Sequence, residues 1–200
     1  MQEPTTVLWA ELAQIFEREG RECAARTAEA LRDCGGLVAS PMLDDPDDRA
    51  IRSLLGSSSL PVARAMLDAH DLLPWGENPV ARQIADKKHE VYATANLMGP
   101  DAPLYAPDLR VGLYYQRPNA RYALHSHAAV ETYVIVAGAA LWTAGEAQRD
   151  VAEGSYIHHS SYLPHACQTG PEGVVALWRW SGDIAVDSYR IHDGMGAFVA

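Results

Sequence analysis

The segment His125-Ser126-His127, followed by Glu131 and Tyr133, constrains the fold more than any other part of the chain. Side chains alternate along a strand, so histidines at i and i+2 point to one face. Glu131 and Tyr133 share their odd-numbered parity, which puts all four side chains on one interior surface if the segment stays extended. Such a buried polar group needs a partner that satisfies it, and a divalent metal does so. The pattern therefore predicts a metal site inside a β-barrel.

A second segment supplies another candidate ligand, His165. It follows Pro164, and the residues between Gly154 and this histidine include Tyr156 and Ile157, which are typical of strands. A His-x-His pair alone recurs by chance, and a single strand histidine is more often a surface or core residue. The prediction depends on the whole set, with ligands brought together from distant strands.

The hydrophobic period changes near residue 90. Beyond it, residues 111–115 alternate, and strand-like runs follow at 122–127, 132–136 and 139–143. Similar runs continue to about residue 190, separated by glycines. This spacing predicts a jelly-roll barrel and not βαβ units.

The N-terminal part of the chain has a helical period. Residues 5–34 predict a helix that Gly20 kinks, and a turn at 44–48 leads into a short helix at 48–55. Pro61 suits the first turn of a third helix, ending at His70.

Residues 74–102 are rich in turn residues, and their middle, about 79–90, is expected to form a helix that packs on the barrel. We therefore expect a helical segment over residues 1–90 and the metal-binding barrel over 91–200. The helical segment either covers an outer face of the barrel or forms a subunit contact.

Composition limits the partners. The 200 residues carry a formal net charge of −10, without a basic patch, which argues against nucleic acid and anionic membranes. No apolar stretch approaches the length of a membrane span, and the first residues lack the features of a signal peptide. We expect a cytoplasmic protein with a small-molecule partner, and the sequence leaves its oligomeric state open.

The three cysteines are odd in number and lack Cys-x-x-Cys spacing, which argues against a disulfide framework or a cysteine zinc site. Cys167 shares the strand parity of His165 and could approach the site, although its simplest role is a small buried apolar residue.

The donor set leaves the metal open among Zn²⁺, Fe²⁺, Mn²⁺, Co²⁺ and Ni²⁺. Tyr133 has two interpretations. It is either a packed barrel tyrosine with a hydrogen-bonded hydroxyl, or an acid–base group whose phenolate a nearby Lewis acid favours.

The first of these segments fits a known motif, G-x5-H-x-H-x3,4-E-x6-G. His125, His127, Glu131 and Gly138 match its histidines, carboxylate and final glycine. Its opening glycine is Asn119 here, and Asn tolerates the turn conformations that Gly adopts. The chain thus resembles the cupin superfamily.

The second cupin motif, G-x5-P-x-G-x2-H-x3-N, is matched at Gly154 and His165. Ser160, Tyr162 and Thr169 replace its Pro, Gly and Asn. The metal-bearing positions are retained while the turn residues differ.

Within the cupins, the chain resembles the dimethylsulfoniopropionate lyases of marine bacteria. Tyr122 precedes the His-x-His pair, a V-E-T-Y run spans Val130–Tyr133, and a P-H-A run spans Pro164–Ala166. Trp178 and Trp180 near the C-terminus also fit this family.

The resemblance implies a carbon–sulfur lyase of the dimethylpropiothetin dethiomethylase type, which releases dimethyl sulfide and acrylate by base-catalysed β-elimination. It implies one divalent metal and no organic cofactor. His127, Glu131 and His165 are the expected ligands, with His125 as a fourth ligand or a substrate contact. Tyr133 is expected to lie close enough to coordinate in some states.

Catalytic roles also follow from the resemblance. Tyr133 is expected to remove the proton, and Tyr122 to help hold the substrate carboxylate or shield the site. The sulfonium cation calls for aromatic faces, for which Tyr122, Tyr162, Trp178 and Trp180 are candidates.

Two other classes stay open. A cupin dioxygenase acting on a small thiol or carboxylate would use the same ligands with Fe²⁺ and consume oxygen. A non-catalytic small-molecule-binding cupin usually accompanies a DNA-binding module, and the sequence has no evident basic helix-turn-helix region.

Overall fold

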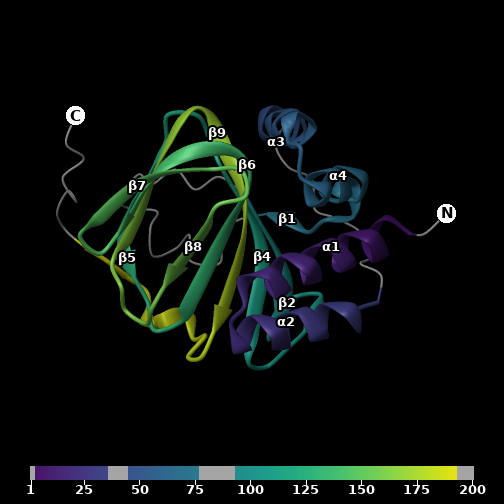
Figure 1. Ribbon diagram of the computed structural model, residues 1–200, viewed down its shortest axis with the longest axis horizontal. Coiled ribbons are helices and arrows are strands. Elements are labelled where there is room, and N and C mark those ends of the chain that lie inside the picture. Colours follow the sequence, from purple (N-terminus) through teal and green to yellow (C-terminus); the bar gives the residue numbers. More distant parts are fainter. Residues whose placement is uncertain (1–2, 36–44, 77–92, 193–200) are drawn as a thin grey trace.

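A computed structural model describes residues 3–35, 45–76 and 93–192 (Figure 1). Its N-terminal part is helical. The helices are α1 (Pro4–Glu19), α2 (Glu22–Arg32), α3 (Asp45–Ser57), α4 (Pro61–Asp68) and the short 3-10 helix η1 (His70–Leu72). The strands of the main sheet are β1 (Trp75–Gly76), β2 (Ala93–Gly99), β3 (Leu104–Tyr105), β4 (Leu109–Gln116), β5 (Arg121–Ser126), β6 (Val130–Ala144), β7 (Ala147–Ala152), β8 (Tyr156–His159), β9 (His165–Ser181) and β10 (Arg190–Ile191). A second 3-10 helix, η3 (Val186–Ser188), precedes β10.

The helix boundaries differ from the sequence prediction in two places. The single helix expected over 5–34 is divided, because Gly20 adopts a left-handed φ of 71° and ends α1. The turn expected over 44–48 is helical from Asp45, since a proline such as Pro46 is tolerated in the first turn. The helix expected over 79–90 lies outside the described residues.

The strands form one curled sheet with the order β1-β2-β4-β9-β5-β10, and β6 joins it through β9 while pairing with β7 and β8 on its other side. Figure 1 shows this sheet as a barrel with the helices to one side. The prediction of a mainly β jelly-roll barrel with N-terminal helices is confirmed.

Strand β6 is longer than predicted. The runs expected at 132–136 and 139–143 belong to one strand that pairs with β9 from Val130↔Ser181 to Ala144↔His165. Gly138 lies between the two runs with φ 79°, and the register shifts there. This glycine bends a continuous strand and does not end it.

Both faces of the central strands are buried, so β4 is buried along its whole length. On its outer face, Val111, Leu113 and Tyr115 belong to the core shared with the helices. On its inner face, Tyr114 belongs to a second cluster inside the barrel. The alternation of the sequence thus separates a helix-facing core from a barrel interior.

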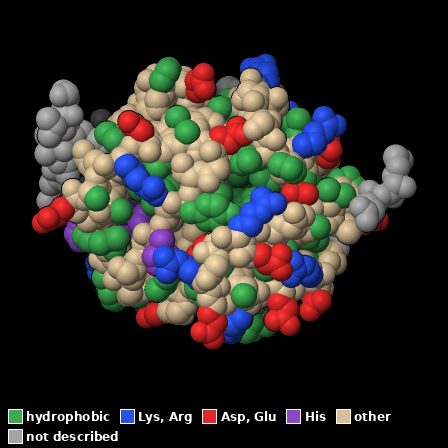
Figure 2. Space-filling model, viewed as in Figure 1, with side chains coloured by type: hydrophobic (Ala, Val, Ile, Leu, Met, Phe, Trp, Pro, Cys, Tyr) green, Lys and Arg blue, Asp and Glu red, His purple; other side chains and the backbone are tan. Residues whose placement is uncertain are grey.

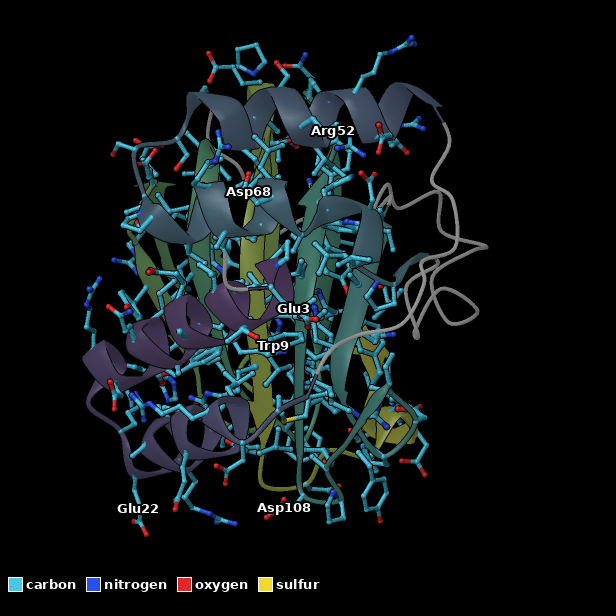
Figure 3. The ribbon with its side chains drawn as sticks, turned by 90° about the vertical axis from the view of Figure 1, so that its right-hand side faces the viewer. Glu3, Trp9, Glu22, Arg52, Asp68 and Asp108 are labelled. Carbon is cyan, nitrogen blue, oxygen red and sulfur yellow. The ribbon has the colours of Figure 1, made fainter. Side chains whose placement is uncertain are left out.

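The helices cover the outer face of the sheet. Figure 3 shows α1 to α4 lying across the strands, with Trp9 labelled beside α1. Trp9 is 2% exposed and donates a hydrogen bond to the carbonyl of Gly35 at 2.9 Å. A buried ion pair also joins α1 to the barrel, because the Arg179 guanidinium lies 2.6 Å from the Glu19 carboxylate. The Thr132 hydroxyl donates to the same carboxylate.

On the face shown in Figure 2, the coloured Lys and Arg side chains lie scattered among Asp and Glu. Among the described residues, no helix has the length and apolar character that crossing a membrane requires.

The bend at Gly138 generates a stability prediction. A Cβ added there would lie 2.1 Å from the Gly173 carbonyl oxygen, and the left-handed φ adds strain. We expect Gly138→Ala to lower the free energy of unfolding by more than about 2 kcal/mol. Gly56→Ala is the control, since it adds a Cβ in open space on α3 and is expected to stabilise by about 0.5–1 kcal/mol. Equal unfolding midpoints of the two variants in urea would contradict this account.

Candidate functional site

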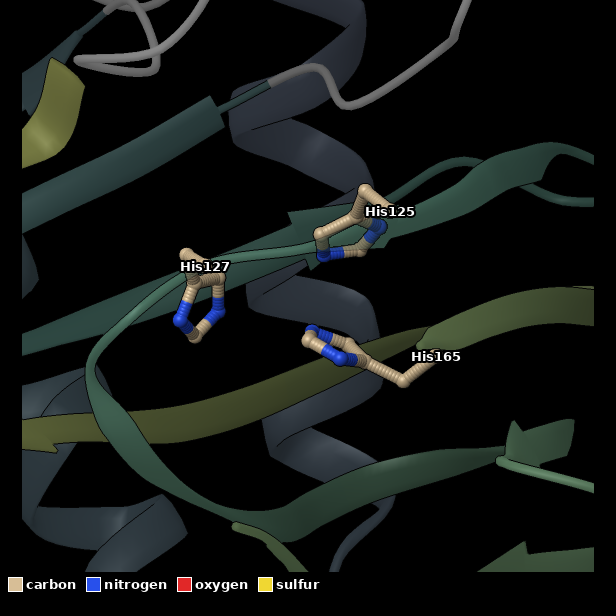
Figure 4. Close-up of side chains that lie close together, drawn as sticks. All are labelled: His125, His127 and His165. Atoms are coloured by element: carbon tan, nitrogen blue, oxygen red, sulfur yellow. The ribbon is translucent and has the colours of Figure 1, made fainter. Parts of the chain in front are cut away.

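Three histidine side chains converge inside the barrel (Figure 4). His125 lies near the end of β5, His127 follows that strand, and His165 begins β9, where it is the register partner of His125. All three are buried. One ring nitrogen of each lies within 4.8 Å of the others. The three histidines identified from sequence are therefore brought together by the fold.

The route by which Glu131 joins them differs from the sequence expectation. The segment does not stay extended, because β5 ends at Ser126 and a new strand, β6, begins at Val130. Glu131 and Tyr133 reach the interior from β6, which pairs with β8 and β9. The shared parity predicted the right face of each strand, while the turn between the strands brings the two faces together.

Each of the three imidazoles is oriented by a main-chain carbonyl. The Nδ1 atom of His125 lies 2.7 Å from the Ala123 oxygen, and those of His127 and His165 make similar bonds to Ala129 and Leu163. A carbonyl only accepts, so each Nδ1 carries a proton, and Nε2, the atom that holds the lone pair of a neutral ring with this tautomer, turns inward. Burial lowers the pKa of His125 well below its ordinary value, which favours the neutral ring.

Glu131 lies at the centre of the cluster and is 2% exposed. Its Oε2 atom is 3.1 Å from His165 Nε2 and 3.4 Å from His127 Nε2. Burial acts to raise the pKa of Glu131, while the hydrogen bonds that its carboxylate accepts from His159 Nδ1 and from the Trp180 indole N–H favour the charged form. The carboxylate is thus an anion that faces nitrogen lone pairs.

This arrangement fits a divalent metal ion. Three inward lone pairs and an anionic oxygen repel one another unless a cation lies between them. The buried His165 Nε2 has no hydrogen-bond partner, as expected of a nitrogen prepared for coordination. Imidazole nitrogen with carboxylate oxygen is a donor set that binds divalent transition metals. His125, His127, Glu131 and His165 therefore present the atoms that such an ion requires.

An aromatic cavity lies beside these donors. Trp178 lines this cavity and packs against Gly112 of β4, where an added Cβ would lie 2.6 Å from the indole. The Tyr122 hydroxyl is 2.7 Å from that of Tyr189. The lining side chains are Thr94, Arg110, Tyr114, Tyr122, His125, His127, Glu131, Tyr133, Trp178, Trp180, Val186 and Tyr189.

Tyr162, predicted as a substrate-binding residue, lies away from this cavity in the structure. It is 57% exposed and does not line this cavity. Its backbone accounts for this position, since Tyr162 replaces the motif's glycine and keeps a left-handed φ of 59° in the turn before β9.

Cys167 is buried within the aromatic cluster of the barrel but also lies outside the cavity lining, and burial raises the pKa of its thiol.

Sequence reasoning missed His159 and Tyr189. His159 Nδ1 lies 2.9 Å from the Glu131 carboxylate, and the Tyr189 ring stacks on that of His125 with centroids 5.0 Å apart. The signal for His159 was its position two residues after Ile157, on the buried parity of β8. For Tyr189 the sequence carried no comparable signal, because this residue precedes the two-residue strand β10 and lies outside the alternating runs.

A jelly-roll barrel with histidines and a carboxylate directed into its interior defines the protein as a cupin. Residues 47–176 match the family model of the dimethylsulfoniopropionate lyases. The match covers more than half of the chain, which therefore belongs to this family.

Individual relatives agree with the family match. The dimethylsulfoniopropionate lyase DddQ of Ruegeria pomeroyi is 26% identical over 73% of this chain and 70% of its own length. A chain from the crystal structures of the lyases RdDddP and RnDddQII has a TM-score of 0.71 and 21% identity, covering 95% of this chain and 98% of that one. The crystal structure of DddQ from Ruegeria pomeroyi has a TM-score of 0.58 and 23% identity, over 90% and 95% of the two chains. The structural likenesses show the shared fold.

The donor geometry predicts the outcome of removing single ligands. We expect the protein to bind one divalent ion, and His127→Ala or His165→Ala to weaken binding by more than the roughly 10- to 100-fold typical of losing an outer partner. His158→Ala is the matched control, because its side chain meets Thr132 on the opposite face of β8. Metal analysis of the purified variants gives the answer, and full occupancy in both the His127 and the His165 variants would contradict the assignment.

Proposed function

We propose that the protein is a metal-dependent carbon–sulfur lyase that cleaves dimethylsulfoniopropionate into dimethyl sulfide and acrylate. The observation that carries the proposal is the group of neutral imidazoles facing the buried Glu131 anion, with Tyr133 on the next inward position of the same strand. Membership of the lyase family supports the substrate.

In this proposal His125, His127, Glu131 and His165 hold the metal, and Tyr133 approaches it in some states. When bound there, the ion would supply positive charge that stabilises the enediolate-like charge developing on the substrate and favours a nearby phenolate. The donor set suits Zn²⁺, Fe²⁺, Mn²⁺, Co²⁺ or Ni²⁺.

The aromatic residues orient the substrate. Trp178 and Tyr122 line the cavity, where their aromatic rings would attract the permanent sulfonium cation. These rings attract the cation without forming an ion pair with it, so its charge is not neutralised before the C–S bond breaks. Their bulk also excludes water from the reacting carbon.

The reaction balances without a redox group. Tyr133 Oη takes the proton from the carbon next to the carboxylate, and the electron pair left behind forms the C=C bond of acrylate. The C–S bond breaks with its electrons on sulfur, which leaves as neutral dimethyl sulfide and needs no acid to protonate it. The protein's tasks are to remove one proton and to stabilise one developing charge.

The direct test is headspace analysis for dimethyl sulfide after adding dimethylsulfoniopropionate to metal-loaded protein, with oxygen uptake followed in parallel. We expect dimethyl sulfide and acrylate in equal amounts without oxygen uptake. Oxygen consumption with a thiol or carboxylate substrate, and no dimethyl sulfide, would instead indicate a cupin dioxygenase.

Tyr133→Phe is expected to reduce turnover by about 10²–10⁴-fold, because it removes the positioned base while leaving the metal ligands in place. Tyr115→Phe is the matched control, since Tyr115 packs in the helix-facing core. Exchange of the substrate α-hydrogen with deuterated water should be lost with Tyr133→Phe. Near wild-type release of dimethyl sulfide by this variant would move the base to Tyr122.

Activity is expected to rise from neutral to alkaline pH. A tyrosine acts as a base only when deprotonated, and its ordinary pKa is about 10. Burial, with the nearby Glu131 charge, raises the pKa of Tyr133 well above that value, against which the bound metal acts. The phenolate fraction therefore grows with pH over this range. A rate that stays flat from about pH 6 to 9, with proton removal shown to be limiting, would argue against a tyrosinate base.

A further inference from the structure

We propose that His159 is a positioning residue that holds the Glu131 carboxylate, and that Trp142 sets the tautomer in which it does so. The inference rests on the metal centre proposed above. It assigns a role to a histidine that lies among the candidate ligands but is not itself a ligand.

The strand register brings His159 to Glu131. The two residues are register partners on the antiparallel strands β6 and β8, so their side chains rise from the same face. His159 is completely buried and Glu131 is 2% exposed. Their contact, 2.9 Å between Nδ1 and Oε2, is therefore shielded from water and stronger than the same contact at the surface.

The direction of this hydrogen bond follows from a third residue. The indole nitrogen of Trp142 is a donor only, and it lies 3.0 Å from His159 Nε2. His159 Nε2 must accept from it, so the single proton of the neutral ring is on Nδ1. That proton is donated to Glu131, which makes a chain of two hydrogen bonds running from Trp142 to the carboxylate.

This engagement separates His159 from the three converging histidines. One of its ring nitrogens lies within 4.8 Å of donor atoms of Glu131 and His165, so proximity alone would admit it as a ligand. Its Nε2 lone pair, however, is used by Trp142, and its Nδ1 carries a proton. The ring instead stacks on His165, with centroids 3.8 Å apart and an interplanar angle of 16°. His159 thus supports two candidate ligands at once.

The carboxylate is held from two sides. Trp180 donates its indole N–H to Glu131 Oε1 at 2.6 Å, and His159 holds Oε2. The terminal torsion of a glutamate is broad, so an unsupported carboxylate rotates easily. With both oxygens fixed, Glu131 keeps one orientation, and its remaining lone pairs point toward the imidazole Nε2 atoms. Removing His159 frees one oxygen.

The test measures metal affinity and the spectrum of the metal, so it does not depend on lyase activity. Cobalt(II) is titrated into wild type, His159→Ala and His159→Asn against a chromophoric chelator, and the visible absorption bands are recorded. The Asn amide can donate from nearly the same place as Nδ1, whereas Ala cannot. His158→Ala is the control on the neighbouring position of β8, whose side chain meets Thr132.

We expect His159→Ala to bind cobalt(II) about 10- to 100-fold more weakly with altered absorption bands, and His159→Asn to recover most of both. Trp142→Phe should weaken binding less, and should add nothing once His159 is alanine. Circular dichroism establishes whether the variants are folded. If His159→Ala does not fold, the comparison is made with His159→Asn alone.

Two outcomes would overturn the inference while wild type binds the metal. Wild-type affinity and bands in His159→Ala would show that the carboxylate needs no support from this ring. Loss of binding in both His159 variants, with Trp142→Phe unaffected, would make His159 a ligand. If wild type binds no cobalt(II), the proposed metal centre itself fails, so the two failures are distinguishable.

Discussion

A charged carboxylate buried inside the curled sheet is the constraint around which this protein is organised. Burial alone would raise the pKa of Glu131 and favour its neutral form. Two donors, Trp180 and His159, satisfy its oxygens, while the Nε2 atoms of His127 and His165 approach without protons to give. The remaining imbalance is negative charge and lone pairs, which a divalent cation corrects.

The two faces of the sheet have different roles, and the stability gained on one face offsets the cost of burying polar groups on the other. The outer face of β4 is covered by the helices, which supply a large apolar core, and the buried pair of Glu19 and Arg179 joins α1 to β9. The interior is therefore free to carry aromatic and polar side chains. Trp178 packs closely against Gly112, and this packing shapes the cavity beside the metal donors. Stability and chemistry are thus assigned to opposite faces of the same strands.

Local spacing predicted much of this from sequence. His125, His127 and Glu131 keep their motif spacing because strand alternation is a short-range property. His159 was missed because its role depends on the pairing of β6 with β8, which no single segment reveals. Tyr162 lies away from the cavity, because it replaces a turn glycine and adopts that turn's left-handed backbone. The amino-acid pattern alone does not determine the pairing register of distant strands or the backbone conformation of a turn.

The central claim is that one metal ion lies between the Glu131 carboxylate and the Nε2 atoms of the three converging histidines. His159 lies outside its coordination shell. Anomalous diffraction from crystals of the cobalt- or zinc-loaded protein tests this most directly. We expect a single anomalous peak at roughly 2.0–2.2 Å from Nε2 of His125, His127 and His165 and from an oxygen of Glu131. A peak bonded to His159, or located away from Glu131, would contradict the account.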